Sequence, residues 1–78
     1  MNNQSVRKEY YSNDIIDEAA HYLSTITDSP KLESEILLAD ILKKDRLDFY
    51  KRNLTIDHLL YKKYRSLLSE RQKGKPLA

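Results

Sequence analysis

Apolar residues recur every three or four positions along much of this 78-residue chain, and that spacing limits its fold more than any other feature. It places apolar side chains on one face of an α-helix, which a neighbouring element must cover. The first run predicts a helix over about residues 13–26, carried by Ile15, Ile16, Ala19, Ala20, Leu23 and Ile26. No segment alternates apolar and polar residues as a half-buried strand does. We therefore expect an all-α fold, a small bundle of four to five short helices with no sheet.

The four residues Thr27-Asp28-Ser29-Pro30 mark the start of a second helix. The Ser29 side chain is expected to accept hydrogen bonds from the free amides of the first turn. Pro30 suits the first helical position, where its missing N–H would have had no partner. The apolar stripe that follows is broad enough to contact neighbours on two sides, and it consists of Leu32, Ile36, Leu37, Leu38, Ala39, Ile41 and Leu42. It predicts the central helix of the bundle.

Two further helices are expected in the second half of the chain. Asp45 is suited to cap a short helix of one or two turns over about residues 45–50. Thr55 is expected to cap the last helix, whose apolar face would contain Ile56, Leu59, Leu60, Tyr64, Leu67, Leu68 and Arg71. Gly74 and Pro76 end this helix, because glycine tolerates the left-handed turn after a helix and proline cannot continue one.

The composition excludes several kinds of functional site. The chain has no cysteine and one glycine, so it offers no thiolate and no glycine-rich loop for a dinucleotide or adenosyl cofactor. Its histidines, His21 and His58, are too few for the converging ligands of a metal site, although Asp17 and His21 lie one helical turn apart. A chain this short buries only about 60% of the surface that it exposes when unfolded, which leaves no room for a large cofactor cleft. We expect no catalytic, cofactor-binding or metal-ligating residues in this chain.

The sequence shows no sign of a membrane segment. No apolar run approaches the roughly 20 residues that span a bilayer, and residues 1–11 are polar, unlike a secretion signal. The absence of cysteine is compatible with a reducing compartment. The sequence therefore favours a cytoplasmic protein with no membrane partner.

Charge is distributed unevenly along the chain. Residues 1–42 contain three basic and eight acidic residues, a net charge of −5, whereas residues 43–78 contain eleven basic and four acidic residues, a net charge of +7. The basic half can attract nucleic acid or an acidic protein surface, or the two halves can attract each other within the bundle. The segment 61–65 combines basic residues with tyrosines, as nucleic-acid sites do, but a solvated helix face explains it better. Nucleic acid is therefore the less favoured partner.

Several short motifs occur in an order and spacing that resemble one protein family. They are Ser29-Pro30-Lys31-Leu32-Glu33-Ser34-Glu35-Ile36-Leu37-Leu38, Lys44-Asp45-Arg46, and Leu67-Leu68 with Arg71 and Gly74-Lys75-Pro76-Leu77-Ala78. Taken together, residues 29–78 resemble the N-terminal domain of the HemK/PrmC protein-(glutamine-N5) methyltransferases. The chain departs from the family pattern at Lys43, where the family usually has glycine, and at Lys75, where it usually has glutamate.

The resemblance implies a function that the composition does not indicate. It implies a helical domain that precedes an S-adenosylmethionine-dependent methyltransferase domain, in an enzyme that methylates the glutamine of the Gly-Gly-Gln motif in class I peptide chain release factors. Residues 13–74 would be the substrate-recognition domain, residues 1–12 a flexible or helix-extending N-terminus, and residues 75–78 the start of a linker. The partner would be a release factor. The cofactor and the catalysis would belong to the parent enzyme and not to this chain.

The resemblance also divides the candidate residues into two groups. Those shared with the family motifs are expected to be mostly structural, and they are Ser29, Pro30, Glu35, Arg46, Arg71, Gly74 and Pro76. Among them, Arg71 and Glu35 are expected to link the second and last helices or to hold a helix end. Three residues of the basic last helix are candidate partner contacts, namely Lys62, Arg65 and Ser69. The alternative is a stand-alone helical module that binds RNA, the ribosome or another protein.

Overall fold

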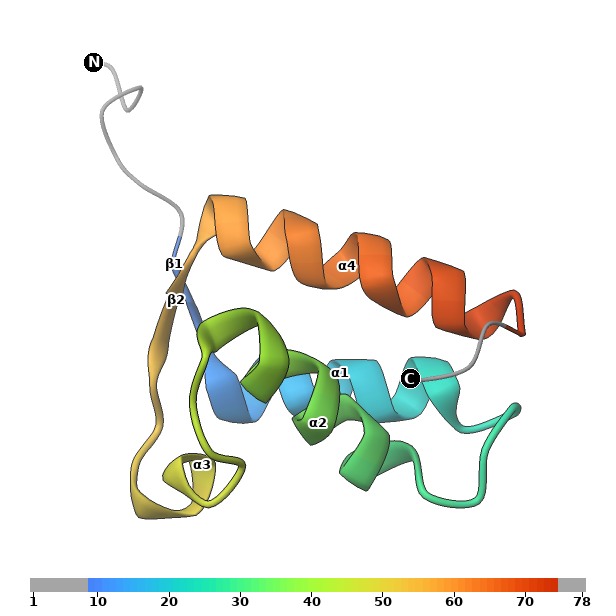
Figure 1. The fold of residues 1–78 in the computed structure, drawn as a ribbon, viewed down its shortest axis with the longest axis horizontal. Coiled ribbons are helices and arrows are strands. Elements are labelled where there is room, and N and C mark those ends of the chain that lie inside the picture. Colours follow the sequence, from blue (N-terminus) through green and yellow to red (C-terminus); the bar gives the residue numbers. More distant parts are fainter. Residues whose placement is uncertain (1–8, 75–78) are drawn as a thin grey trace.

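A computed structural model describes residues 9–74 of the chain (Figure 1). Within this range the chain forms four helices and two short strands. Their order is β1 (Glu9–Tyr11), α1 (Ser12–Leu23), α2 (Pro30–Leu42), α3 (Asp48–Lys51), β2 (Thr55–Asp57) and α4 (His58–Gln72). The mostly helical architecture agrees with the periodicity of the sequence, whereas the strands were not expected.

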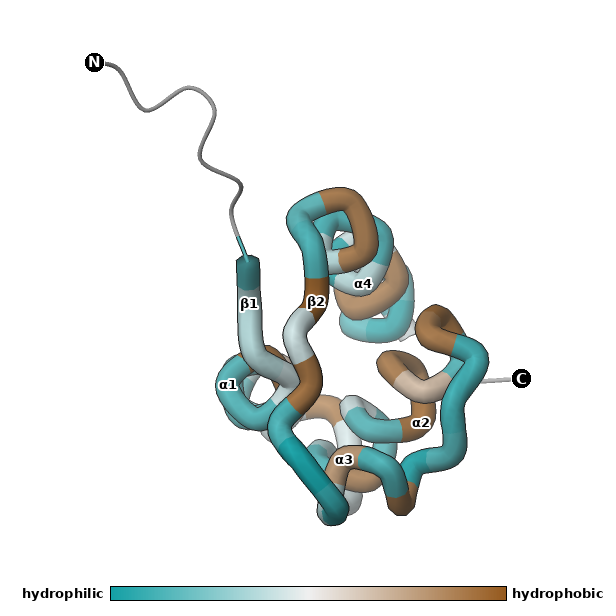
Figure 2. The backbone as a smooth tube through the Cα atoms, turned by 90° about the vertical axis from the view of Figure 1, so that its left-hand side faces the viewer, coloured by the Kyte–Doolittle hydropathy of each residue, from teal (hydrophilic) through white to brown (hydrophobic). Residues whose placement is uncertain are grey.

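The expectation of no sheet is wrong, because β1 and β2 pair as an antiparallel ribbon. Tyr10 lies opposite Ile56, and the Ser12 N–H donates to the Leu54 carbonyl at 2.8 Å, which continues the pairing into α1. Figure 2 shows β1 running into α1 and β2 running into α4, so the ribbon joins the near ends of the first and last helices. Strands of three residues are too short to show a period of two, and their pairing joins residues distant in sequence. Periodicity alone could not reveal them.

One hydrophobic core lies between α1, α2 and α4, and α2 packs against both of the other helices. The buried apolar residues come from every helix and from β2. They are Ile15, Ile16, Ala19, Leu23, Leu38, Ala39, Phe49, Ile56, Tyr64 and Leu68. The predicted stripe on α1 therefore supplies much of the core, and α2 takes the predicted central position.

The buried face of α2 differs from the predicted one. Leu32 and Ile36 remain 41% and 38% exposed, while Glu33, Ser34 and Glu35 are buried. Burying a charged side chain is costly unless it is paired and hydrogen-bonded, so each glutamate needs partners within the fold. Those partners, described below, explain why α2 turns a partly polar face inward.

The helix ends also differ in part from expectation. α2 starts at Pro30 as predicted, but the Ser29 side chain makes no capping bond, and its carbonyl accepts from the Glu33 N–H at 3.0 Å. Thr55 lies in β2, and α4 is capped by Asp57, whose Oδ1 accepts from the Leu60 N–H at 2.9 Å. The chain forms the strand first, which moves the helix cap and the helix start two residues downstream.

Left-handed residues follow α2 and α4. Lys43 has φ 57° at the C-terminal end of α2, where the family pattern usually has glycine. Gly74 has φ 99°, and its N–H donates to the Arg71 carbonyl at 2.9 Å, as expected of the residue that stops α4. The expected helix breaker Pro76 lies outside the described residues.

None of the helices in the described part of the chain is long and apolar enough to cross a membrane.

Candidate functional site

Glu33 of α2 binds Arg71 of α4 in a two-pronged ion pair. Arg71 Nε donates to Glu33 Oε1 at 2.8 Å, and Arg71 Nη2 donates to Oε2 at 3.2 Å. The Thr27 hydroxyl donates to the same Oε2 at 2.6 Å. The hydrogen bond from Arg71 holds the pKa of Glu33 below its usual value, against the opposing effect of burial, and Thr27 adds to the lowering. The pair joins α2 to α4 across the core edge.

Glu35 was expected, with Arg71, to link the second and last helices or to hold a helix end, but it binds Arg46 and Tyr50 instead. It is 2% exposed and accepts from Arg46 Nε at 3.1 Å and from the Tyr50 hydroxyl at 2.5 Å. Both carboxylate oxygens of Glu35 are therefore occupied. The hydrogen bond to Glu35 raises the pKa of Tyr50, because ionising the phenol would break it. The shared motif residues Glu35 and Arg46 thus fix α3 and the loop before it against α2.

Tyr64 provides a third polar contact to α2. Its ring is fully buried, and its hydroxyl donates to the Ser34 carbonyl at 2.9 Å. Burial raises the pKa of Tyr64 well above its usual value. Since Ser34 Oγ donates to the Pro30 carbonyl at 2.7 Å, the polar atoms at this buried contact are hydrogen-bonded.

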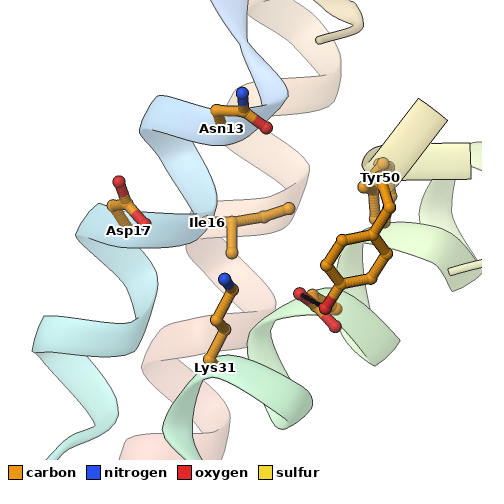
Figure 3. Close-up of a pocket in the computed structure, with 7 residues that line it drawn as sticks. Asn13, Ile16, Asp17, Lys31 and Tyr50 are labelled. Carbon is orange, nitrogen blue, oxygen red and sulfur yellow. Dashed lines mark hydrogen bonds between the residues drawn. The ribbon is translucent and has the colours of Figure 1, made fainter. Parts of the chain in front are cut away.

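The ring of Tyr50 forms one wall of a pocket of about 380 Å³ between α1, α2 and α3 (Figure 3). Asn13 and Asp17 of α1 and Lys31 of α2 lie at its edge, and Ile16 points toward Tyr50. Tyr50 is 57% exposed, and Lys31 Nζ lies 5.8 Å from the centroid of its ring. A largely exposed aromatic ring whose hydroxyl is bound to a buried carboxylate is a fixed surface suited to binding.

The three candidate contacts on α4 are not equivalent. Lys62 is exposed, Ser69 is half-buried, and Arg65 is partly held by other residues. Arg65 Nη1 lies 3.7 Å from Glu18 Oε1, and the Arg65 guanidinium lies 5.4 Å from the ring centroid of Tyr22. Lys62 is therefore more accessible to a partner than Arg65, and the neighbouring Lys63, which the sequence reasoning did not select, is also exposed.

Aromatic side chains cluster where the ribbon meets α4. The rings of Tyr10 and Tyr61 stack with their centroids 3.9 Å apart and their planes 13° apart, and the Tyr10 hydroxyl lies 3.0 Å from His58 Nδ1. Tyr61 also donates from its hydroxyl to Glu18 Oε1 at 3.0 Å. The tyrosines of segment 61–65 are thus engaged within the fold, Tyr64 in the core and Tyr61 against Tyr10. This weakens the idea that they stack on nucleic-acid bases.

The sequence reasoning missed the pocket and the partner of Arg71. Glu33 and Glu35 are acids inside a strongly apolar stretch of α2, and that pattern was the available signal for buried, paired carboxylates. The pocket gave no comparable signal, because it combines residues from three elements. Within residues 9–74, no three His, Cys, Asp or Glu side chains converge as the ligands of a metal ion would.

Most of the chain is similar to a described protein family. The family model for the PrmC N-terminal domain matches residues 14–78. The matched range contains nearly all of α1 and the whole of α2, α3, β2 and α4, and it leaves β1 outside. No curated protein and no solved structure matches the chain.

Proposed function

This chain belongs to the PrmC N-terminal domain family, the N-terminal domain of PrmC/HemK methyltransferases, and from that premise we propose that it recognises a peptide chain release factor. In the proposed enzyme, a separate domain binds S-adenosylmethionine and methylates the glutamine of the release factor's Gly-Gly-Gln motif. The reaction would take place in the cytoplasm. The family match over residues 14–78 is the observation that carries this proposal.

The proposed contribution of this domain is orientation. A domain that holds the body of a substrate converts the encounter between a mobile loop and a catalytic site into an effectively intramolecular event. Such a task suits a domain whose elements are held together by ion pairs on buried glutamates, such as Glu33–Arg71 and Glu35–Arg46. Rigid elements place binding residues more reproducibly than loops do.

The exposed face of α4 supports an acidic partner surface. Lys62 and Lys63 of α4, and Lys73 directly after it, are exposed and contribute positive charge, whereas Arg65 is partly neutralised by Glu18. Complementary charge of this kind steers association more than it adds to affinity. We therefore assign this face the role of accelerating and orienting the encounter with the release factor.

The test is direct binding of the 78-residue chain to a purified, unmethylated class I release factor, with the affinity measured by isothermal titration calorimetry and the association rate by surface plasmon resonance. We expect saturable 1:1 binding, and an association rate that falls as ionic strength rises. Replacing Lys62 and Lys63 together by Gln should slow association, while Lys51→Gln, on α3, should leave it unchanged. Absence of binding at low salt would refute the proposal.

A second test uses the methyltransferase that carries this domain. Removing the domain should reduce methylation of the intact release factor far more than methylation of a short Gly-Gly-Gln peptide, because only the intact factor offers a body to hold. Equal loss for both substrates would indicate a structural role and would contradict recognition.

A further inference from the structure

The pocket between α1, α2 and α3 has features of a binding site that the family match does not assign. It has a volume of about 380 Å³, within the range of about 300–1,000 Å³ that is usual for small-ligand sites. Ile16 and Phe49 contribute apolar surface to its lining, and the other lining residues contribute polar atoms. Polar groups that line a pocket fix the orientation of whatever binds there.

The charges around the pocket balance. Glu35 is paired with Arg46, with 3.1 Å between Oε1 and Nε, so this buried carboxylate is already neutralised. Of the remaining charged residues that line the pocket, Asp17 comes from α1 and Lys31 from α2. In the described part of the chain, none of the ion pairs joins these two. The pocket therefore offers an acceptor and a cationic donor from two different walls, with no net charge to favour an anion or a cation.

A peptide group is complementary to this arrangement. In a trans peptide bond the N–H and the C=O point in opposite directions, so one group can donate to Asp17 while its carbonyl accepts from Lys31. The Asn13 carboxamide at the α1 edge offers a further donor and acceptor. The exposed face of the Tyr50 ring can then pack against the neighbouring side chain.

The position of Tyr50 depends on the family-motif residues. The Tyr50 hydroxyl donates to Glu35 at 2.5 Å, and Glu35 is in turn held by Arg46. Glu35 lines the pocket, but both of its carboxylate oxygens are already hydrogen-bonded, so we class Glu35 and Arg46 as positioning residues. This gives the shared Glu35 and Arg46 a consequence for recognition as well as for stability.

We propose that this pocket binds an extended peptide segment of the protein partner, with a backbone amide held between Asp17 and Lys31 and an uncharged side chain packed on Tyr50. The inference rests on the proposed function, since it takes the release factor as the source of the peptide. It adds a short-range anchor to the long-range attraction exerted by α4. Affinity then depends chiefly on the pocket, and association rate chiefly on Lys62 and Lys63.

The decisive experiment exchanges the two charges of the pocket. The double variant Asp17→Lys with Lys31→Asp keeps the net charge of the chain but reverses the direction in which a peptide group can bind. Its affinity for an unmethylated class I release factor, measured by calorimetry, should fall about tenfold or more, as expected for the loss of two charge-assisted hydrogen bonds. The matched control is Asp40→Lys with Lys43→Asp, two exposed residues at the other end of α2. This control should change affinity less than about twofold.

Three outcomes are informative. If the unsubstituted chain binds and only the pocket exchange weakens binding, the inference holds. If the unsubstituted chain binds and the pocket exchange has no effect, the inference is wrong while the proposed function survives. If the unsubstituted chain does not bind the release factor, both fail.

A second set of variants covers the case in which the charge exchange prevents folding. Asp17→Asn and Lys31→Met are smaller changes at exposed positions, and each should weaken binding severalfold without changing the circular dichroism spectrum. Adding release factor to the 15N-labelled chain should shift the backbone amide signals of residues 13, 17, 31 and 50. Shifts confined to α4 would overturn the inference.

Discussion

At the scale of single residues, the described chain is organised by two buried glutamates, each satisfied by an arginine from another element. Glu33 binds Arg71, and Glu35 binds Arg46 and Tyr50. A buried carboxylate that loses its partner keeps its desolvation cost, so removing the arginine is more damaging than the strength of the bond alone suggests. Removing Arg71 should therefore cost more stability than removing an arginine from an exposed ion pair.

Arg71→Ala should lower the free energy of unfolding by about 1.5–3 kcal/mol, because among the described residues it leaves the Glu33 carboxylate with Thr27 as its one side-chain partner. Arg65→Ala is the matched control on the same helix, since its ion pair with Glu18 is longer, at 3.7 Å, and largely exposed. It should cost less than about 1 kcal/mol. Urea denaturation followed by circular dichroism measures both values, and equal losses would contradict the distinction.

Lys43→Gly should stabilise the protein by about 1 kcal/mol. Lys43 has φ 57° at the end of α2, a conformation that costs an L-residue with a side chain roughly 1–2 kcal/mol and costs glycine little, while glycine is more flexible in the unfolded chain. Lys44→Gly, one residue further on, only makes the unfolded chain more flexible, so it should not stabilise the protein. A lower melting temperature for Lys43→Gly would show that the Lys43 side chain makes a favourable contact.

At the scale of elements, α4 shows how far the apolar pattern predicts burial. The predicted face contained both Leu59 and Leu68, but Leu59 is 77% exposed whereas Leu68 is fully buried. Leu59 precedes Leu68 by nine residues, which is two and a half turns at 3.6 residues per turn, so the two side chains lie on opposite sides of α4. The predicted face therefore wrongly included Leu59, whereas its neighbours Leu60 and Tyr61 pack against the core.

Leu68→Ala should cost about 2–5 kcal/mol, the usual range for emptying a buried leucine site. Leu59→Ala, the same substitution nine residues earlier in the same helix, should change stability by less than about 0.5 kcal/mol. Comparing their urea midpoints tests the rotational phase of α4. Similar losses would place Leu59 in the core and contradict the fold.

The ribbon and α4 should be coupled through the stacked rings of Tyr10 and Tyr61. A double-mutant cycle with Tyr10→Leu and Tyr61→Leu should give a coupling energy of about 0.5–1.5 kcal/mol, as is usual for aromatic pairs. The cycle isolates this contact from the general loss of apolar area. Additive effects of the two substitutions would mean that β1 is not held against α4 in solution.

At the scale of the whole molecule, the ribbon and the ion pairs connect parts of the chain that are distant in sequence. β1 and β2 join the start of α1 to the start of α4, and Arg71 joins the end of α4 to the start of α2. Much of the stability therefore depends on contacts that form only once the chain has collapsed. The acidic first half, with a net charge of −5, and the basic second half, with a net charge of +7, are in direct contact where Arg65 pairs with Glu18.

The stability of the whole domain should fall at both ends of the pH range. The pKa of Glu33 is lowered in the fold, so its contribution is complete above the unfolded value of 4.5 and is lost as the pH falls through the lower folded value. The pKa of Tyr64 is raised, so its contribution is complete below the unfolded value of 10.0 and is lost as the pH rises above it. In thermal melts, the difference between the unsubstituted chain and Arg71→Ala should shrink below pH 4. A difference that stays constant with pH would mean that the protonation of Glu33 does not affect the stability of the fold.

Local sequence patterns determined most of the helices, because helix formation depends on residues three and four apart and on the residues at helix ends. The apolar run from Ile15 and the Ser29-Pro30 boundary predicted α1 and α2 closely, and Gly74 predicted the end of α4. The motifs between residues 29 and 78 also identified the family, because their order along the chain can be recognised without knowing which contacts the residues make.

Only the tertiary structure decided the features that require two distant segments to meet. The pairing of Tyr10 with Ile56, the choice of Glu33 as the partner of Arg71, and the pocket beside Tyr50 each join residues that no local pattern links. A periodicity states which face of a helix is apolar, but not which neighbour covers it. Buried charges follow the same rule, because a carboxylate can be buried wherever the folded chain brings a cation to it.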